Sequence, residues 1–233
     1  MLVFNGIQKT TLVDFPGQVA CTLFLPKCNF RCPYCYNSAL VFEQDTGVKI
    51  TEQEAFDFLE SRKNLLDGVC VTGGEPSLHA ELPDFFRKLK EKGFLVKLDT
   101  NGSNPQVLKK LFDEKLVDYV AMDIKAPLEK YPEVCNASVD LKAIAESVKL
   151  IRESGINYEF RTTVLPKFIG KDDLLAIGKW LNGSKLYALQ QFFSEGNMLD
   201  PSLKNEKRYS RVDIELFAEM LNPFFGRVEV RNV

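Results

Sequence analysis

The sequence predicts an α/β protein in which successive β/α units surround a parallel sheet. From residue 19 to the end, short apolar or β-branched runs alternate with longer amphipathic segments, which is the pattern of six β/α units. The apolar runs are near-continuous, as expected for strands buried on both faces of a parallel sheet. A chain of 233 residues with 45% hydrophobic content can bury one sizeable core, so one large domain is expected.

Strands are predicted at residues 19–25, 68–72, 95–99, 119–123, 158–164 and 185–189, with a shorter one at 227–231. The helices between them are predicted from periodicity and caps. Thr51 and Glu54 form a capping-box pattern at the start of one helix, and Asn104-Pro105 begins another. Apolar residues at helical spacing predict three more helices, at 141–151, at 174–181 and around 214–221. The polar, aperiodic stretch 200–211 is predicted to be a surface loop.

The composition excludes several classes of function. Lys and Arg total 30 against 32 Asp and Glu, a net charge of −2, so the chain as a whole has no electrostatic footprint for nucleic acid or an anionic membrane. The single histidine, His79, excludes a multi-histidine site for zinc, copper or iron. The amino terminus lacks a signal-peptide pattern, and no run of about 18 apolar residues occurs. We therefore expect a cytoplasmic protein.

The strongest signal is a cluster of cysteines. Six cysteines are too sparse for a secreted disulfide scaffold, yet three of them fall within eight positions. Cys28, Cys32 and Cys35 follow the first predicted strand with the spacing C-x3-C-x2-C. Pro26 and Pro33 prevent a continuous helix or strand there, so the segment must loop. Three thiolates on so short a loop can converge on one metal centre.

Two kinds of metal centre fit this loop. A structural zinc site would need a distant fourth ligand such as His79, Cys21 or Cys70, but the chain lacks the second Cys-x2-Cys pair of zinc ribbons. A centre with three protein ligands keeps one metal position open for substrate or cofactor, and the spacing differs from that of bacterial ferredoxins, which supply a fourth cysteine locally. The open centre is favoured. Cys21, Cys70 and Cys135 are interpreted as small strand or helix residues.

Three polar motifs follow later strands, at the carboxyl ends where β/α folds collect their ligands. Gly73-Gly74-Glu75-Pro76 follows the second strand, and its glycines permit close approach of backbone to a ligand while its carboxylate can accept from an ammonium. Asp99-Thr100-Asn101-Gly102 and Asp123-Ile124-Lys125 follow the third and fourth. In isolation these motifs could be a tight turn, an Asn-Gly turn and an exposed ion pair. Arg161 interrupts an apolar strand, so it needs an anionic partner if it points inward.

The cysteine spacing resembles the signature of the radical S-adenosylmethionine (SAM) superfamily, a C-x3-C-x2-C loop after the first barrel strand. The resemblance implies that Cys28, Cys32 and Cys35 hold three irons of a [4Fe–4S] cluster. It implies that SAM chelates the open iron through its amino and carboxylate groups, and that Tyr34 lies beside the adenine. Gly73-Gly74-Glu75-Pro76 resembles the GGE motif of that superfamily, which implies contact with the SAM amino group.

Other stretches resemble the branch of this superfamily that activates glycyl radical enzymes. These are TLVDFPG at 11–17, DTNG at 99–102 and DIK at 123–125. The match implies that Lys125 faces the SAM carboxylate, with Arg161 as a second candidate. It also implies a monovalent-cation site beside SAM, formed by the positions Asp99, Thr100 and Asp123.

Two positions depart from the pattern of that branch. Position 36 is Tyr36 where many activases carry histidine. The stretch Gln191-Phe192-Phe193 stands where pyruvate formate-lyase activase has a Pro-Tyr-His stretch that contributes to the SAM ribose site. Both departures fall on positions that the resemblance connects with the bound cofactor.

The resemblance covers about residues 8–196 and implies a partial parallel (β/α)6 barrel of the TIM-like type, in a single domain over 1–233 with a carboxyl-terminal extension at 197–233. It implies reductive cleavage of SAM and formation of a glycyl radical on a partner enzyme. The chain looks closest to the activating proteins of anaerobic ribonucleoside-triphosphate reductase, so that reductase is the expected partner. A flavodoxin- or ferredoxin-type protein is the expected electron donor, with no nucleic acid or membrane involved.

Two alternatives remain open at this point. The first is a radical SAM enzyme that acts on a small molecule, similar to a 7-carboxy-7-deazaguanine synthase, against which the DTNG stretch and the lead-in VDFPG at 13–17 both argue. The second is a non-catalytic iron–sulfur or zinc module that binds a partner. Release of 5′-deoxyadenosine from SAM on reduction is expected of the enzyme and not of the binding module.

Overall fold

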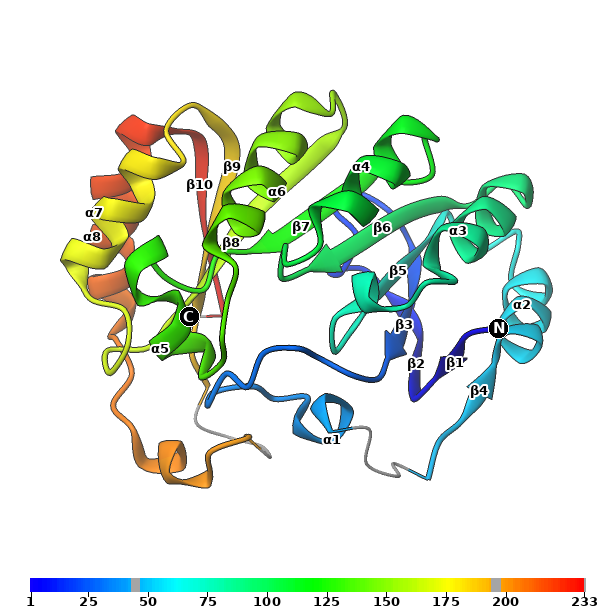
Figure 1. Cartoon of the computed structure of the whole chain (residues 1–233), viewed down its shortest axis with the longest axis horizontal. Coiled ribbons are helices and arrows are strands. Elements are labelled where there is room, and N and C mark those ends of the chain that lie inside the picture. The colour runs from blue at the N-terminus through cyan, green and yellow to red at the C-terminus, as the bar shows by residue number, and fades with distance from the viewer. Residues whose placement is uncertain (43–46, 194–197, 233) are drawn as a thin grey trace.

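The chain, as a computed structural model, is described over residues 1–42, 47–193 and 198–232. Its largest element is an eight-stranded sheet (Figure 1). The strands of this sheet are β2 (Gly6–Thr11), β3 (Ala20–Leu25), β5 (Gly68–Gly73), β6 (Leu95–Thr100), β7 (Tyr119–Asp123), β8 (Asn157–Val164), β9 (Ser184–Gln191) and β10 (Phe225–Arg231). They are ordered β10-β9-β8-β7-β6-β5-β3-β2, and every neighbouring pair is parallel except β2 with β3.

The sheet forms a partial barrel because its two end strands, β2 and β10, do not pair with each other. Strands β3 and β5 through β9 of this sheet, which excludes β4, are buried along most of their length, in agreement with their apolar sequences. The predicted partial parallel barrel is confirmed. Strand β10 extends the parallel sheet beyond β9, so the segment after residue 196 contributes to the same sheet.

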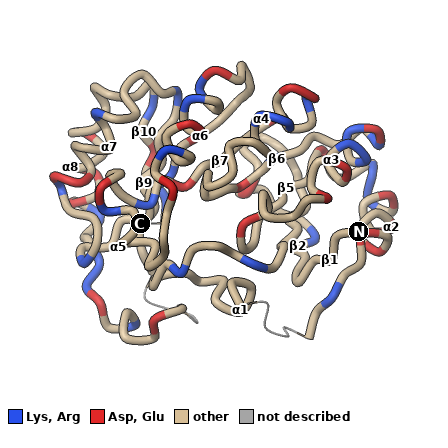
Figure 2. The backbone as a smooth tube through the Cα atoms, viewed as in Figure 1, with Lys and Arg blue, Asp and Glu red and all other residues tan. Residues whose placement is uncertain are grey.

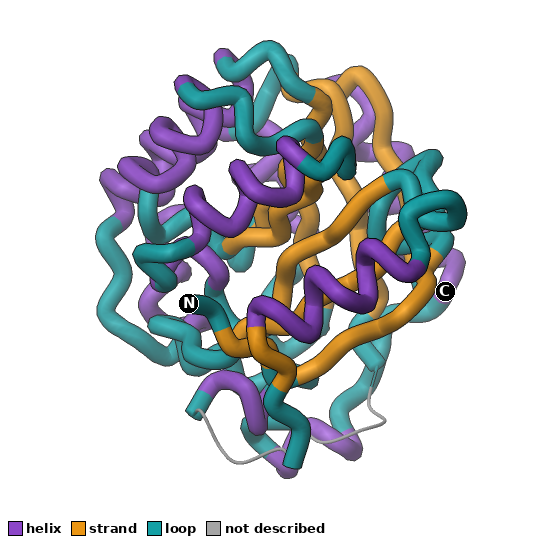
Figure 3. The backbone as a smooth tube through the Cα atoms, turned by 90° about the vertical axis from the view of Figure 1, so that its right-hand side faces the viewer, coloured by secondary structure: helices purple, strands orange, loops and turns teal. Residues whose placement is uncertain are grey.

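Most of the helices lie along the outer face of the sheet, and the strands form the inner layer (Figures 1 and 3). The helices are α1 (Ser38–Val41), α2 (Glu52–Ser61), α3 (Leu82–Glu91), α4 (Pro105–Asp113), α5 (Tyr131–Cys135), α6 (Leu141–Glu153), α7 (Lys171–Trp180) and α8 (Arg211–Leu221). Helix α6 is a typical example. It begins after Asp140, whose carboxylate accepts from two backbone N–H groups, and it buries Ile144, Val148 and Ile151.

The predicted strands and helices are all present, with ends that differ by no more than three residues. The capping box of Thr51 and Glu54 is formed, and Pro105 is the first residue of α4. Strand β2 was not expected, because its sequence GIQKTT is polar and half exposed and carries no apolar run. Helix α3 was not expected either. It begins at Leu82, has Pro83 in its first turn and buries Phe85, Phe86 and Leu89 at helical spacing.

The prediction of a surface loop at 200–211 is wrong in part. Residues Pro201–Asn205 form a short 3-10 helix, which places Leu203 in the core. The Asp200 N–H donates to the carbonyl of Pro33 at 2.8 Å. This segment therefore packs against the cysteine loop, which no local pattern in the sequence indicates.

Two smaller features complete the fold. Strands β1 (Val3–Phe4) and β4 (Ile50–Thr51) form a two-stranded antiparallel sheet near the amino terminus. Both signs of charge are interspersed along the outer helices α3, α4, α6 and α8 (Figure 2). Across the described ranges, no helix has the length and apolar character needed to cross a membrane.

Candidate active site at the carboxyl ends of the strands

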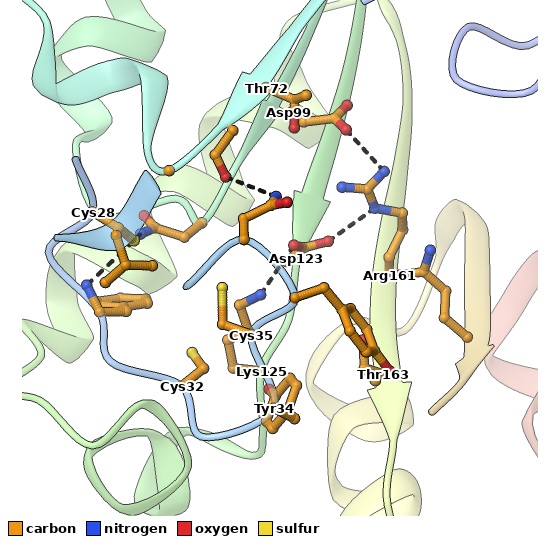
Figure 4. A pocket seen from close by; sticks show the side chains of 18 of the residues that line it. Cys28, Cys32, Tyr34, Cys35, Thr72, Asp99, Asp123, Lys125, Arg161 and Thr163 are labelled. Atoms are coloured by element: carbon orange, nitrogen blue, oxygen red, sulfur yellow. Dashed lines mark hydrogen bonds and ion pairs between the residues drawn. The ribbon is translucent and has the colours of Figure 1, made fainter. Parts of the chain in front are cut away.

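The three clustered cysteines line one cavity of about 320 Å³ (Figure 4). Their loop starts at the end of β3, where Lys27 takes a positive φ of 69° and turns the backbone. Further along, the Cys35 N–H donates to the Cys32 carbonyl at 3.0 Å. The volume is in the range of small-molecule sites. The predicted convergence of Cys28, Cys32 and Cys35 on one cavity is therefore present.

Backbone contacts hold this loop over the end of β5. The Gly74 N–H donates to Leu25 O at 2.8 Å, and the next residue, Glu75, donates to Lys27 O at 2.7 Å. A Cβ at Gly74 would lie 2.1 Å from the Lys27 carbonyl oxygen, and one at Gly73, where φ is +120°, would lie 2.3 Å from the Leu25 carbonyl oxygen. Both positions require glycine because two backbones cross there. Both glycines also line the cavity.

The Glu75 carboxylate is fully buried and joins the first polar motif, 73–76, to the second, 99–102. Its Oε1 accepts from the Ser77 N–H at 3.0 Å, the Ser77 hydroxyl at 2.6 Å and the Thr100 hydroxyl at 2.7 Å. Its Oε2 accepts from the Asn101 N–H at 2.6 Å. Neither Glu75 nor Pro76 is among the cavity-lining residues. In this structure Glu75 positions the loop that carries Thr100 and Asn101.

Charged side chains of alternating sign run from the barrel interior toward the cavity (Figure 4). Arg161 on β8 donates from Nη1 to Asp99 Oδ2 at 3.2 Å and from Nε to Asp123 Oδ1 at 2.9 Å. Lys125 donates from Nζ to Asp123 Oδ2 at 3.0 Å. The carboxylates of Asp99 and Asp123 are therefore the anionic partners that an inward-pointing Arg161 was expected to need.

These ion pairs keep the groups charged inside the barrel. Burial alone would raise the pKa of the Asp123 carboxyl, but Arg161 and Lys125 outweigh it and hold that pKa well below the usual range. Burial is likewise outweighed at Asp99, whose pKa is lowered by Arg161 and Lys97. The carboxylates in turn raise the pKa of Lys125 and Arg161 despite burial. All of these side chains are therefore ionised near neutral pH.

The three thiols have unequal surroundings. Burial raises the pKa of Cys28 to about 11 and also raises the pKa of Cys35. The neighbouring Cys135 thiol lowers the pKa of Cys32, with burial opposing it and the Lys125 ammonium assisting it. The sequence interpretation of Cys135 as a small helix residue holds for its burial in α5. It missed the contact with Cys32, because the two cysteines lie on different elements.

The carboxamide of Asn101 interacts with the cysteine loop. Its Nδ2 donates to Asn29 Oδ1 at 2.9 Å and lies 3.9 Å from Cys28 Sγ. The Phe30 N–H is 3.4 Å from the same sulfur. Hydrogen bonds to a ligating sulfur are one means by which a protein adjusts an iron–sulfur centre.

The two positions that depart from the activase pattern contact each other. The Tyr36 hydroxyl donates to the Phe193 carbonyl at 2.8 Å and accepts from the Phe193 N–H at 2.6 Å. The Tyr36 ring stacks on Phe192 with a centroid separation of 6.2 Å. Tyr36, Gln191 and Phe193 all line the cavity. The segment that follows β9 is thus joined to the cysteine loop through Tyr36 and Phe193.

Two polar atoms of cavity-lining residues are buried without a hydrogen-bond partner in the described structure. They are the Tyr34 hydroxyl and Gln191 Oε1. Buried polar atoms are rarely left unpaired, so an unpaired atom in a cavity indicates the place of a ligand. Sequence reasoning missed other lining residues, among them Thr72, Thr163 and Gln190. Thr163 could have been found, because it lies two residues after Arg161 and shares its face of the strand.

The zinc alternative gains no support from the geometry. Over residues 1–42, 47–193 and 198–232, no three or more Cys, His, Asp or Glu side chains meet where one metal ion could bind. The ring of His79 contacts the Pro26 carbonyl at 2.8 Å, and the Cys70 thiol lies 3.8 Å from Asp99 Oδ1. Cysteines of an iron–sulfur cluster each bind a different iron, so they do not need to meet around one ion.

Comparisons with known proteins show the family of the chain. The model of the radical SAM superfamily matches residues 22–180. A Methanocaldococcus jannaschii protein that carries the name glycyl-radical enzyme activating enzyme is 36% identical over 194 residues, which cover 81% of this chain and 79% of that protein. The pyruvate formate-lyase 1-activating enzyme of Escherichia coli K12 is 27% identical over 177 residues, covering 72% of this chain and 70% of that enzyme.

A solved structure shares the fold. Streptococcus suis SuiB bound to S-adenosylmethionine superimposes with a TM-score of 0.68 at 13% identity, covering 91% of this chain and 52% of SuiB. At this level of identity the likeness concerns the fold. It places the chain among partial α/β barrels of the same architecture.

Proposed function

Because the chain belongs to the radical SAM superfamily, in its branch of glycyl-radical enzyme activating enzymes, we propose that it generates a glycyl radical on a partner enzyme. The main support for this proposal is that three thiols and the ion-paired side chains of Asp99, Asp123 and Lys125 line the same cavity. Superfamily members use a [4Fe–4S] cluster and SAM. The residues of this cavity fit both groups.

The thiol set fits the cluster. Cys28, Cys32 and Cys35 would each bind a different iron and leave one iron without a protein ligand. The pKa of Cys32 is lowered by the neighbouring Cys135 thiol and by the Lys125 ammonium, which favours the thiolate form that ligation needs. The amide groups of Phe30 and Asn101 lie near the sulfur of Cys28. These contacts would stabilise negative charge on that ligand.

The polar lining fits SAM. Lys125 uses one of its three donors on Asp123, and its side chain is 17% exposed, so the ammonium can also reach a carboxylate in the cavity. The unpaired Tyr34 hydroxyl and Gln191 Oε1 supply one donor and one acceptor for the adenosine part. The amino group of SAM would lie toward Gly73 and Gly74, whose backbones are uncovered by any side chain of their own.

When bound and reduced, the cluster supplies the electron that cleaves SAM to methionine and a 5′-deoxyadenosyl radical, which removes a hydrogen atom from glycine. The side chains of this site bind, orient and exclude water. Ion pairing of Asp123 with Arg161 and Lys125 holds the ammonium of Lys125 in place before SAM arrives. Such preorganisation reduces the entropy lost on binding.

We infer a macromolecular partner, and anaerobic ribonucleotide reductase is the one proposed. The barrel is open between β2 and β10, which suits a glycine loop that enters from another protein. A flavodoxin- or ferredoxin-type electron donor and a cytoplasmic location are part of the same proposal.

The test uses the partner's own glycine. The reductase is prepared with deuterium at its radical-forming glycine, and SAM cleavage is started anaerobically in the presence of the reduced, cluster-loaded activase. Deuterium is expected in 5′-deoxyadenosine, together with a glycyl radical signal in electron paramagnetic resonance. Pyruvate formate-lyase prepared in the same way is the comparison substrate. Label transfer to that enzyme alone would replace the reductase as the proposed partner.

A small-molecule reaction is the contrasting outcome. No transfer of deuterium from either polypeptide, together with fast SAM turnover on a small metabolite, would refute activation of a glycyl radical enzyme. SAM cleavage without any acceptor is expected to be slow, because the substrate loop is needed to close the cavity. The rate ratio with and without the partner therefore measures coupling.

A further inference from the structure

The monovalent-cation site that the activase resemblance implies does not fit the residues of this chain. Its expected ligands are Asp99, Thr100 and Asp123. The Thr100 hydroxyl donates to Glu75 at 2.7 Å and accepts from the Gly102 N–H at 3.1 Å. Both oxygens of Asp123 are paired, one with Arg161 and one with Lys125 (Figure 4).

Asp99 is paired at both oxygens as well. Its Oδ2 accepts from Arg161 at 3.2 Å, and its Oδ1 makes a close ion pair with the ammonium of Lys97. Lys97, Arg161 and Lys125 thus pair with every oxygen of Asp99 and Asp123, and Arg161 also lies 3.9 Å from Glu159 Oε1. A further cation at this place would have to displace one of these partners, because no oxygen of the two carboxylates is unpaired.

Lys97 is the residue that distinguishes this arrangement. It lies on β6 two residues before Asp99, so both side chains point to the same face of the strand, into the barrel. Its side chain is 1% exposed. Besides Asp99, the ammonium lies 3.8 Å from Cys70 Sγ and 5.8 Å from the centre of the Tyr119 ring. A buried ammonium without a carboxylate partner is destabilising, so the ion pair with Asp99 is needed to keep the charged Lys97 inside the barrel.

We propose that the Lys97 ammonium replaces the monovalent cation in this chain, so that SAM binding requires no alkali metal ion. Lys97 acts as a positioning residue: it neutralises one oxygen of Asp99 from inside the barrel, so that Arg161 can bridge Asp99 and Asp123, which holds Lys125. Without Lys97, the two carboxylates would share two cations, and the charge that an alkali ion supplies would be missing. This inference rests on the proposed binding of SAM in the cavity.

The test measures SAM binding to the cluster-loaded protein in two anaerobic buffers of equal ionic strength. One contains potassium chloride and the other tetramethylammonium chloride, whose cation is too large for a site between carboxylates. The dissociation constant of the parent is expected to differ by less than twofold between them. For Lys97→Met, it is expected to be at least tenfold weaker in tetramethylammonium and to recover in potassium.

A second readout does not depend on the cluster or on SAM. In the cluster-free Lys97→Met protein, potassium is expected to raise the thermal unfolding midpoint relative to tetramethylammonium, and the cluster-free parent is expected to show no such difference. Lys90→Met is the matched control, because Lys90 pairs with Asp118 at 2.7 Å on the outside of the barrel. It is expected to respond like the parent in both measurements.

Several results would overturn the proposal. If the parent protein needs potassium to bind SAM, the proposal is refuted. It is also refuted if Lys97→Met binds SAM equally in both buffers, or if Lys97→Met holds a full cluster and potassium does not restore its SAM binding. If Lys97→Met fails to fold, the double variant Lys97→Met, Asp99→Asn, which removes both charges, is expected to fold and bind SAM independently of potassium. Dependence on potassium in that variant would refute the role of Asp99. Failure of the parent to bind SAM in either buffer would instead refute the proposed function.

Discussion

Replacement of Glu75 separates its structural role from contact with SAM. In the structure its carboxylate accepts two backbone N–H groups, from Ser77 and Asn101, at 3.0 and 2.6 Å, and two hydroxyl groups, from Ser77 and Thr100. Glu75, Ser77 and Asn101 are all buried. In Glu75→Ala the two N–H groups lose their acceptor and have no water to replace it, whereas the hydroxyl groups can rotate.

A buried donor without a partner costs about 1–3 kcal/mol. With two such donors, Glu75→Ala is expected to lower the free energy of unfolding by about 2–6 kcal/mol. Glu75→Gln keeps the shape of the side chain and one acceptor oxygen, but its NH2 group faces a donor where the second oxygen accepted. The free energy of unfolding of Glu75→Gln is therefore expected to fall by about 1–3 kcal/mol. The control is Glu219→Gln, an exposed change on α8, which should stay within about 0.5 kcal/mol of the parent.

The assay is urea unfolding of cluster-free protein followed by circular dichroism. The absence of cluster and SAM from this measurement isolates the structural contribution. Midpoints are expected in the order Glu219→Gln, Glu75→Gln, Glu75→Ala, from highest to lowest, with unchanged slopes. A Glu75→Ala protein as stable as the Glu219→Gln control would refute the structural role, and Glu75 would then be left with the SAM ammonium as its function.

Three further outcomes are expected. Cys32→Ala should abolish iron binding and SAM cleavage. The control is Cys135→Ala, on α5, which should keep the iron. Equal iron content in Cys32→Ala and the parent would contradict the cluster assignment. Lys125→Ala should weaken SAM binding by about 1.5–3 kcal/mol, because it removes a hydrogen bond from a charged group. This loss corresponds to a dissociation constant about 10- to 150-fold higher. An unchanged dissociation constant in calorimetry would remove Lys125 from the site. The folded-state pKa of Asp99 is lowered, so its stabilising contribution is present above the unfolded value of about 3.9 and is lost as pH falls through the folded value. Asp99→Asn should therefore show a shallower loss of unfolding free energy than the parent between about pH 5 and 2, and parallel pH curves would count against the ion pairs.

Local patterns in the sequence determined the order and type of most elements. Apolar runs bounded by caps predicted the parallel strands, because burial on both faces of a sheet demands them. The cysteine spacing predicted the loop after β3, because two prolines and three thiols leave few other structures. The polar motifs after the next three strands were expected on one side, since the carboxyl ends of parallel strands meet at one edge.

Tertiary structure alone decided which of these side chains meet. Glu75 bonds Asn101, Cys135 contacts Cys32, and the two departures at Tyr36 and Phe193 bond each other across 157 positions. The pairing of Lys97 with Asp99 is the instructive case, because both lie on β6 and their shared face could be predicted from their spacing of two. What the spacing could not tell is that Arg161 takes the other oxygen of Asp99 from β8. A strand pattern reports which face a residue occupies, whereas its partner depends on the register of a strand far away in the chain.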